Sequence, residues 1–96
     1  MNAADQRQVE SARVQAKNRR DMELNDLRVI LSMPEGKRFF RRMFSMGHME
    51  NEPFTGNSAT FYNLGMRQFA LKYWNDVKEA DVAAFVNIIT EGEDHG

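Results

Sequence analysis

The chain has 96 residues, 42% of them apolar and 28% charged, and a formal net charge of −1 at pH 7. This apolar content excludes a wholly disordered chain, and the near-neutral charge argues against a general nucleic-acid binder, whose domain is basic overall. The absence of cysteine excludes disulfide bonds and thiolate chemistry. A single domain of this size has a modest hydrophobic core, so we expect a partner or a homo-oligomer.

The charge is distributed unevenly along the chain. Residues 1–50 carry ten Lys and Arg against seven Asp and Glu, whereas residues 51–96 carry three against seven. Such a split indicates either a polar assembly surface or a chance imbalance. No apolar run approaches the roughly 18 residues of a membrane span, and the polar N-terminus is unlike a signal peptide. We therefore expect a soluble protein made in the cytoplasm, with no membrane span.

The first 20 residues contain few large apolar side chains, only Val9 and Val14 beyond Met1. Their composition favours a helix, but the apolar stripe is too thin to bury much surface. We predict a charged N-terminal helix or arm over residues 1–20 that is frayed or ordered by a partner.

Stronger periodicity begins at Met22 and predicts an amphipathic helix that ends near Leu31. Leu27 and Ile30 are its expected core residues. Next along the chain, Ser32 and Glu35 have the spacing of a capping box, in which the Ser side chain accepts a backbone N–H and the Glu reaches back.

The capping box, together with Pro34, predicts a second helix from Met33 to about Met46. Phe40 and Phe44 are its expected core residues, and Gly47 is placed to end it in a left-handed conformation.

Basic residues share one stripe of this second helix and recur at the end of the first 20 residues. They are predicted to bind a partner, and they are Arg19, Arg20, Lys37, Arg38, Arg41 and Arg42. Such a stripe can contact phosphates or an acidic protein surface, and a solvated helix face has the same pattern.

The segment Phe54–Gly65, FTGNSATFYNLG, lies between the second and third helices. It lacks the G-x-x-x-x-G-K-[ST] spacing of a phosphate-binding loop and a preceding strand. It is better interpreted as the start of a helix, with Asn57 or Ser58 as the cap and Gly56 in a turn with positive φ. Phe54 is predicted to fold back on the first turn of this helix.

The third helix is predicted from about Ser58 to Val77 and is apolar on two faces. A helix apolar nearly all round is usually buried, so we expect it to be the central element. Its predicted core residues are Phe61, Gly65, Phe69 and Trp74, with Gly65 at a close helix crossing.

A last helix is predicted from Val82 to about Thr90, capped by Asp81. Its inward residues are expected to be Val82, Phe85, Val86, Ile88 and Ile89. No segment alternates with period two, so the sequence predicts an all-α protein, a small bundle of about four helices. We divide it into the N-terminal helix or arm (1–20), a helical domain (21–91) and an acidic polar tail (92–96).

No pattern in the chain predicts catalysis or a cofactor. His48 lies near two Glu residues but lacks a metal-binding spacing, and Asp76, Glu79 and Asp81 are expected to be solvated caps. We therefore predict a protein that is not an enzyme and binds neither a metal nor a cofactor.

Three strings, taken in order, resemble a known family. They are Asp26–Arg28 (DLR), Leu31–Phe39 (LSMPEGKRF) and Phe54–Arg67 (FTGNSATFYNLGMR). Together they are similar to a family of small tailed-bacteriophage proteins typified by "protein nineteen" of a Bordetella phage, over about residues 24–90. The resemblance implies a virion component or assembly factor, because the family's genes lie among virion-morphogenesis genes near those for portal and capsid. It implies no catalytic residues.

Two functions follow as hypotheses. In the first, the protein is a structural or assembly component that docks on portal, internal core or capsid proteins, in the host cytoplasm and then in the virion. In the second, it is a small DNA-associated protein whose basic stripe lies along phosphates during packaging or host takeover. The near-neutral charge and the many aromatic residues favour the first.

Overall fold

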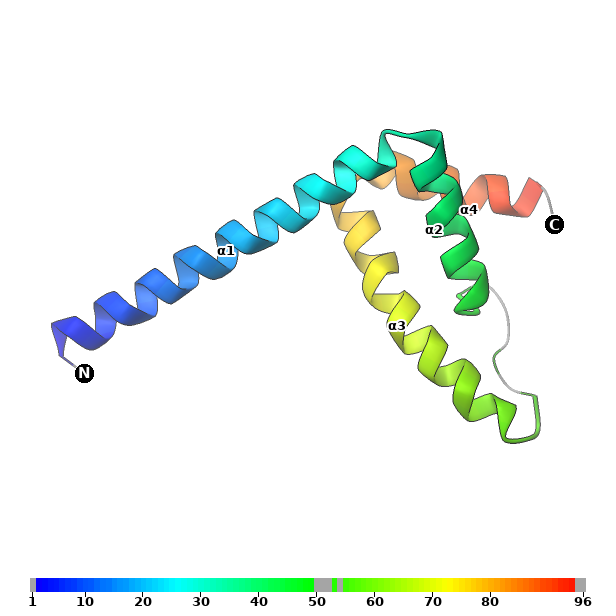
Figure 1. Cartoon of the computed structure of the whole chain (residues 1–96), viewed down its shortest axis with the longest axis horizontal. Coiled ribbons are helices and arrows are strands. Elements are labelled where there is room, and N and C mark those ends of the chain that lie inside the picture. The colour runs from blue at the N-terminus through cyan, green and yellow to red at the C-terminus, as the bar shows by residue number, and fades with distance from the viewer. Residues whose placement is uncertain (1, 50–52, 54, 95–96) are drawn as a thin grey trace.

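A computed structural model describes residues 2–49, 53 and 55–94 of the chain. These residues form four α-helices: α1 (Ala3–Leu31), α2 (Pro34–Met46), α3 (Ala59–Ala80) and α4 (Val82–Asp94). No strand occurs within these described ranges, and the protein is a small all-α bundle, as predicted. Figure 1 shows that α1 extends away from the other three helices, which gather around its C-terminal end.

The long helix α1 runs without interruption across the predicted boundary at residue 20. Its N-terminus is capped by Asn2, whose Oδ1 accepts a hydrogen bond from the Asp5 amide at 2.9 Å. Its C-terminal part carries the predicted apolar face, of which Leu24, Leu27 and Leu31 are buried. Helix α1 ends at Leu31, as expected.

Ile30 is 38% exposed, so its predicted place in the core is wrong. Successive residues of a helix are rotated by about 100°, which puts Ile30 at the edge of the face that Leu24, Leu27 and Leu31 share.

The turn between α1 and α2 does not contain the predicted capping box. Ser32 is the C-cap of α1, because its amide still bonds to the Arg28 carbonyl at 3.0 Å and its Oγ donates to Val29 at 2.6 Å. Met33 is the N-cap residue of α2 and provides no side-chain cap. Glu35 lies in the first turn of α2, where its negative charge is favourable to the helix dipole.

Gly36 explains how closely α2 can follow α1. A Cβ atom at Gly36 would lie 1.9 Å from the carbonyl oxygen of Ile30, so any larger residue would push the two helix ends apart. Gly36 is buried in this turn.

Gly47 ends α2, but not in the predicted left-handed conformation. Its φ is −86°, and His48 has the positive φ of 55° instead. A Cβ atom at Gly47 would lie 2.3 Å from the Cβ of Ala70, so this glycine marks the close approach of α2 and α3. The predicted close crossing at Gly65 is wrong, because a Cβ there would meet no atom within 4 Å.

The start of α3 follows the predicted turn. Gly56 has a φ of 80°, and the Asn57 Oδ1 accepts a hydrogen bond from the Ala59 amide at 2.9 Å. Ser58 occupies the N-cap position, but its side chain makes no capping hydrogen bond. Phe54 lies outside the described residues, and so does its predicted contact with the helix.

Helix α3 is buried only along its C-terminal half, where Ala70, Val77 and Ala80 face the core. Phe61 is 79% exposed and Phe69 is 59% exposed, so their predicted burial is wrong. Phe69 lies beside Ala70, level with α2, but its side chain is on the open side of the two helices. For Phe61 the reason is length: α3 has 22 residues and spans about 33 Å, whereas the 13 residues of α2 span about 20 Å. The N-terminal half of α3 therefore extends past its neighbours.

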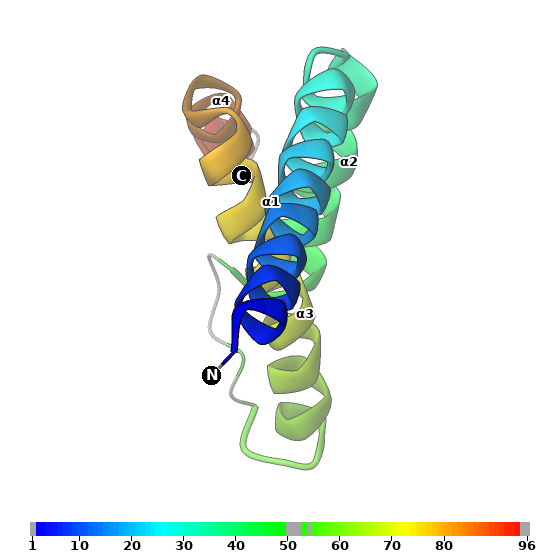
Figure 2. The ribbon, with the colours of Figure 1, turned by 90° about the vertical axis from the view of Figure 1, so that its left-hand side faces the viewer.

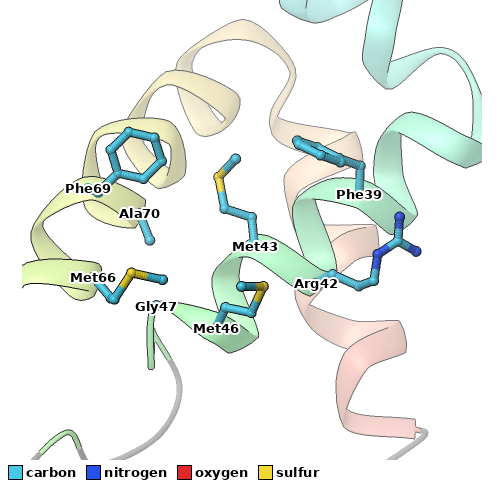
Figure 3. A pocket seen from close by; sticks show the side chains of 8 residues that line it. All are labelled: Phe39, Arg42, Met43, Met46, Gly47, Met66, Phe69 and Ala70. Atoms are coloured by element: carbon cyan, nitrogen blue, oxygen red, sulfur yellow. The ribbon is translucent and has the colours of Figure 1, made fainter. Parts of the chain in front are cut away.

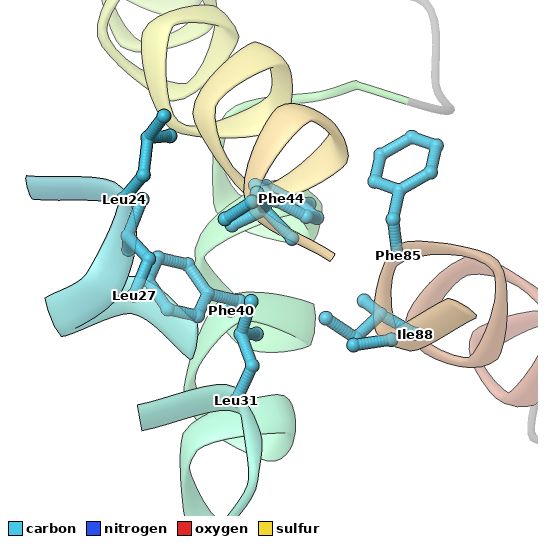
Figure 4. Packing of buried hydrophobic residues seen from close by; sticks show 10 residues of the cluster. Leu24, Leu27, Leu31, Phe40, Phe44, Phe85 and Ile88 are labelled. Carbon is cyan, nitrogen blue, oxygen red and sulfur yellow. The ribbon is translucent and has the colours of Figure 1, made fainter. Parts of the chain in front are cut away.

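The four helices meet at one apolar cluster, shown in Figure 4. Leu31 of α1, Val77 of α3 and Ile88 of α4 are its most completely buried large side chains, each at most 1% exposed. Phe40 and Phe44 complete the cluster from α2. The core thus lies at one end of α1 and of α3.

Aromatic rings extend this core toward α4. The Trp74 ring packs edge-on against Phe44 at a centroid distance of 5.1 Å and against Phe85 at 4.8 Å. Trp74 and Ile89 are partly buried against the cluster, and Phe85 is buried, which agrees with their predicted positions.

Helix α4 begins as predicted, because the Asp81 Oδ1 accepts a hydrogen bond from the Ala84 amide at 3.0 Å. Val82 and Val86 were expected to face inward but are 62% and 50% exposed. Only one face of α4 has a neighbour. The helix continues to Asp94, so most of the predicted polar tail is helical, and residues 95–96 lie outside the described part of the chain.

The core assignment can be tested with two substitutions. Leu31→Ala is expected to lower the free energy of unfolding by about 2–5 kcal/mol, because it leaves a cavity where the helices meet. Phe61→Ala, at an exposed site, is expected to change it by no more than about 0.5 kcal/mol. Urea unfolding followed by circular dichroism measures both, and an equal loss for the two variants would contradict this core.

Candidate interaction site

The N-terminal part of α1 is an exposed arm, which we define as residues 2–19. Every residue of this arm is exposed, and the helix rises about 1.5 Å per residue, so the arm extends about 25 Å from the body. Figures 1 and 2 show it projecting beyond the other helices. Val9 and Val14 are 42% and 58% exposed, and charged side chains of both signs surround them.

A second exposed feature is an apolar groove of about 320 Å³ between α2 and α3 (Figure 3). Its lining consists of Phe39, Arg42, Met43, Met46, Gly47, Met66, Phe69 and Ala70. Phe39, Met46 and Phe69 are each more than half exposed. The sequence did not predict this groove, because it depends on the distance between two helices that the close Gly47–Ala70 contact sets.

The predicted basic residues are divided among three places. Arg19 is exposed on the arm, Arg20 binds α3, and the other four lie on α2. Of these four, Arg42 lines the apolar groove. The six therefore do not share one continuous face, and their predicted role in partner binding stays a prediction.

Arg41 joins α2 to α4. Its guanidinium forms a 2.8 Å ion pair with Glu91, and its Nε donates to the Ile88 carbonyl at 3.2 Å. Arg38 lies 3.8 Å from Glu35 on the same helix. A pocket of about 370 Å³, comparable in volume to the apolar groove, is lined by residues that include Arg41, Lys37 and Glu91. Part of the basic stripe thus has an internal structural role.

An ionic cluster joins α1 to α3 where the arm leaves the body. Arg20 contacts Asp76 at 2.8 Å, Glu79 at 2.7 Å and Glu23 at 3.2 Å, and Lys72 contacts Asp76 at 2.7 Å. Asp76 was expected to be a solvated cap, but the residue is only 8% exposed. Its pairing with Arg20 spans 56 positions, beyond the reach of any local sequence pattern.

The charged groups of this cluster shift one another's pKa values. The hydrogen bonds that Arg20 donates to Asp76 and Glu79 raise the pKa of Arg20, and the hydrogen bond that Lys72 donates to Asp76 raises the pKa of Lys72. Partial burial alone would raise the pKa of Asp76, but the hydrogen bonds from Arg20 and Lys72 outweigh it and lower the pKa below its usual value. All three groups are therefore charged at neutral pH.

The described residues contain no group of three His, Cys, Asp or Glu side chains that is arranged to hold a metal ion. Among the described helices, none combines the length and the hydropathy that crossing a membrane requires.

Compared with known proteins, the chain matches no family model, no curated protein and no solved structure. The resemblance to the phage family therefore stays a hypothesis drawn from the three strings of residues.

The cluster predicts a specific acid sensitivity. In the folded chain the pKa of Asp76 lies below its usual value of 3.8. Ionised Asp76 therefore stabilises the fold fully above pH 3.8, and this stabilisation is lost as the pH falls through the pKa of Asp76 in the folded chain. The melting temperature of the wild type is therefore expected to fall between about pH 5 and pH 2. Asp76→Asn is expected to be less stable at pH 7 and to lose less on acidification.

Circular dichroism melts across this pH range measure the effect. Asp21→Asn, which removes an exposed carboxylate of α1, is the matched control and should retain the wild-type acid dependence. An Asp76→Asn variant with an unchanged acid profile would show that the cluster does not stabilise the fold.

Proposed function

We propose that this chain is a non-enzymatic structural or assembly protein of a tailed bacteriophage that acts through helix-mediated protein–protein contacts. Its partners are virion or assembly proteins, associated with the portal, the internal core or the capsid. It acts in the host cytoplasm during assembly and then resides in the virion. The observation that carries this proposal is the arm of residues 2–19, in which every residue is exposed.

The arm is suited to a protein partner for a physical reason. Isolated helices of this length are marginally stable in water, and most of a helix's stability in proteins comes from packing one face against a neighbour. The arm has no such neighbour within the chain. A partner protein that packs against the arm would supply this neighbour.

A membrane surface is a poorer match for the arm. Helices that lie in the membrane interface combine a basic face with large apolar residues such as Trp, Phe and Leu. The arm contains none of these three, and Asp5 and Glu10 interrupt its positive charges.

The phage assignment rests on the three strings that resemble the family, and their residues mostly build the body of the fold. Leu27 is buried in the core, Gly36 allows the tight turn before α2, and Asn57 caps α3. Arg28 donates to the Ala80 carbonyl at 2.8 Å and so joins α1 to the end of α3. Structural roles of this kind would explain why a family shares these strings for the sake of its fold, with no active site to maintain. The arm lies outside the part of the chain that resembles the family. The choice of partner would therefore depend on arm residues that are particular to this chain.

The test is the protein content of purified phage particles. Mass spectrometry is expected to detect the chain at a fixed number of copies per particle. A variant that lacks residues 2–18 is expected to fold, because these residues are exposed, but to be missing from the particles. Absence of the full chain from both particles and assembly intermediates would contradict the proposal.

Binding to DNA is the alternative, and the pairing of Arg20 and Arg41 with carboxylates weakens it. Phosphate binding depends on unpaired cations that release counterions from the duplex. We expect no retardation of a duplex in a gel at about 50 mM salt, the condition that favours such binding. Retardation that disappears as salt rises, and that Arg42→Ala weakens, would favour the DNA-associated function.

A further inference from the structure

We propose that the apolar groove between α2 and α3 is the surface through which two copies of this chain pair. The pairing is face to face, about a two-fold axis, so that α2 and α3 of each copy form a four-helix bundle. This inference rests on the proposed function only in that both treat the chain as an assembly protein. It is tested with the pure protein, so the two can fail separately.

The first argument is the shape of the single chain. Its principal extents are 57 × 35 × 15 Å and its radius of gyration is 17.8 Å. A compact domain of 96 residues has a radius of gyration of about 12.5 Å. The backbone is 15 Å thick along its shortest axis, which corresponds to two layers of helices, because one helix backbone is about 5 Å across and packed helices lie about 8–10 Å apart. The excess radius of gyration therefore comes from elongation, because α1 and the N-terminal half of α3 extend beyond the shared core and leave Tyr62 and Phe69 of α3 exposed.

The second argument is the exposed area. A compact protein of 11.1 kDa exposes about 5,700 Å². This chain exposes 7001 Å². The arm contributes to the difference of about 1,300 Å², which also exceeds the roughly 800 Å² per partner that a standard interface buries. The single chain therefore has enough exposed surface for a stable dimer.

The third argument is the pattern of apolar side chains along the groove. Phe39, Met43 and Met46 follow one stripe of α2 at i, i+4 and i+7. On α3, Tyr62, Met66 and Phe69 repeat the same spacing. This is the spacing at which a helix presents its residues to a neighbouring helix. The outer residues of both stripes are exposed in the single chain, where Met46 is 63% and Tyr62 is 69% exposed, whereas Met43 and Met66 between them are partly buried.

A second copy fits this groove better than the other occupant that the chain offers, the arm. Val9 and Val14 are five positions apart and so point about 140° from each other around the helix. They cannot both enter one groove. A two-fold interface uses the same surface of both copies, so the half-exposed Phe39 and Phe69 side chains of one copy can enter the groove of the other, and methionine side chains adapt to the shape of these rings.

The position of the charged side chain at the groove is compatible with this pairing. Arg42 is the one charged residue that lines the groove, and Figure 3 shows its guanidinium pointing away from α3. Two copies can then pack the Met and Phe side chains together while each Arg42 stays at the rim, in water. No charge needs to be buried between them.

Analytical ultracentrifugation of the cysteine-free wild type tests the pairing directly. We expect a dimer at micromolar concentrations and a monomer on dilution. Phe69→Glu is expected to weaken the dimer at least tenfold, because it places a charge in the centre of the interface. Phe61→Glu is the matched control: it makes the same change on the same helix but outside the groove, and it should leave the dimer unchanged.

Circular dichroism must show that both variants are as helical as the wild type. A wild type that stays monomeric at all concentrations would overturn the proposal, and so would a Phe61→Glu variant that dissociates as readily as Phe69→Glu.

Cross-linking identifies which surfaces meet. Met66→Cys introduces a single thiol in the groove, and a short bifunctional maleimide is expected to join two copies through it. Val82→Cys, on the exposed face of α4, is expected to remain largely monomeric under the same conditions.

The arm as occupant is tested by mixing Met66→Cys with Val14→Cys. Preferential joining of the two different variants would show that the arm fills the groove, and would overturn the face-to-face pairing. Preferential joining of Met66→Cys to itself supports the pairing.

Discussion

The apolar cluster to which Leu31, Val77 and Ile88 belong, and to which all four helices contribute, is the interaction on which the rest of the structure depends. A core at a single meeting point buries only the parts of each helix that reach it. Helices α1 and α3 are longer than this core, so each extends beyond it at its N-terminal end. The exposed arm and the exposed half of α3 are thus direct consequences of where the core lies.

Polar contacts determine the direction in which the arm leaves that core. Arg20 and Arg28 lie eight positions apart on α1 and bond to α3, the first through Asp76 and Glu79 and the second through the Ala80 carbonyl. Exposed ion pairs contribute little to stability, but Asp76 is largely buried and would be costly to leave unpaired. These two contacts hold α1 at a defined angle to α3, so the arm projects as a fixed continuation of a folded helix.

The sequence predicted what depends on local pattern and failed where the outcome depends on distant neighbours. The extent of α2, the turn at Gly56 and the Asp81 cap were all predicted, because each follows from a few adjacent residues. Phe61 and Phe69 were misplaced, because periodicity shows that a face is apolar without showing whether a partner helix reaches it. The Arg20–Asp76 pair and the groove could not be predicted either, since both depend on how far apart two helices lie.

The aromatic residues of α3 that the sequence predicted to be buried, but that are exposed, have a physical explanation. The sequence shows a helix that is apolar on two faces, and such a helix normally has neighbours on both. Within the single chain, the C-terminal half of α3 has these neighbours, whereas Tyr62 and Phe69 are 69% and 59% exposed, and Phe69 lines the groove. Large apolar side chains that remain in water at regular helical spacing indicate a surface that is completed by association. The proposed pairing would cover Phe69 but not Phe61, so it would account for only part of the pattern that predicted a buried central helix.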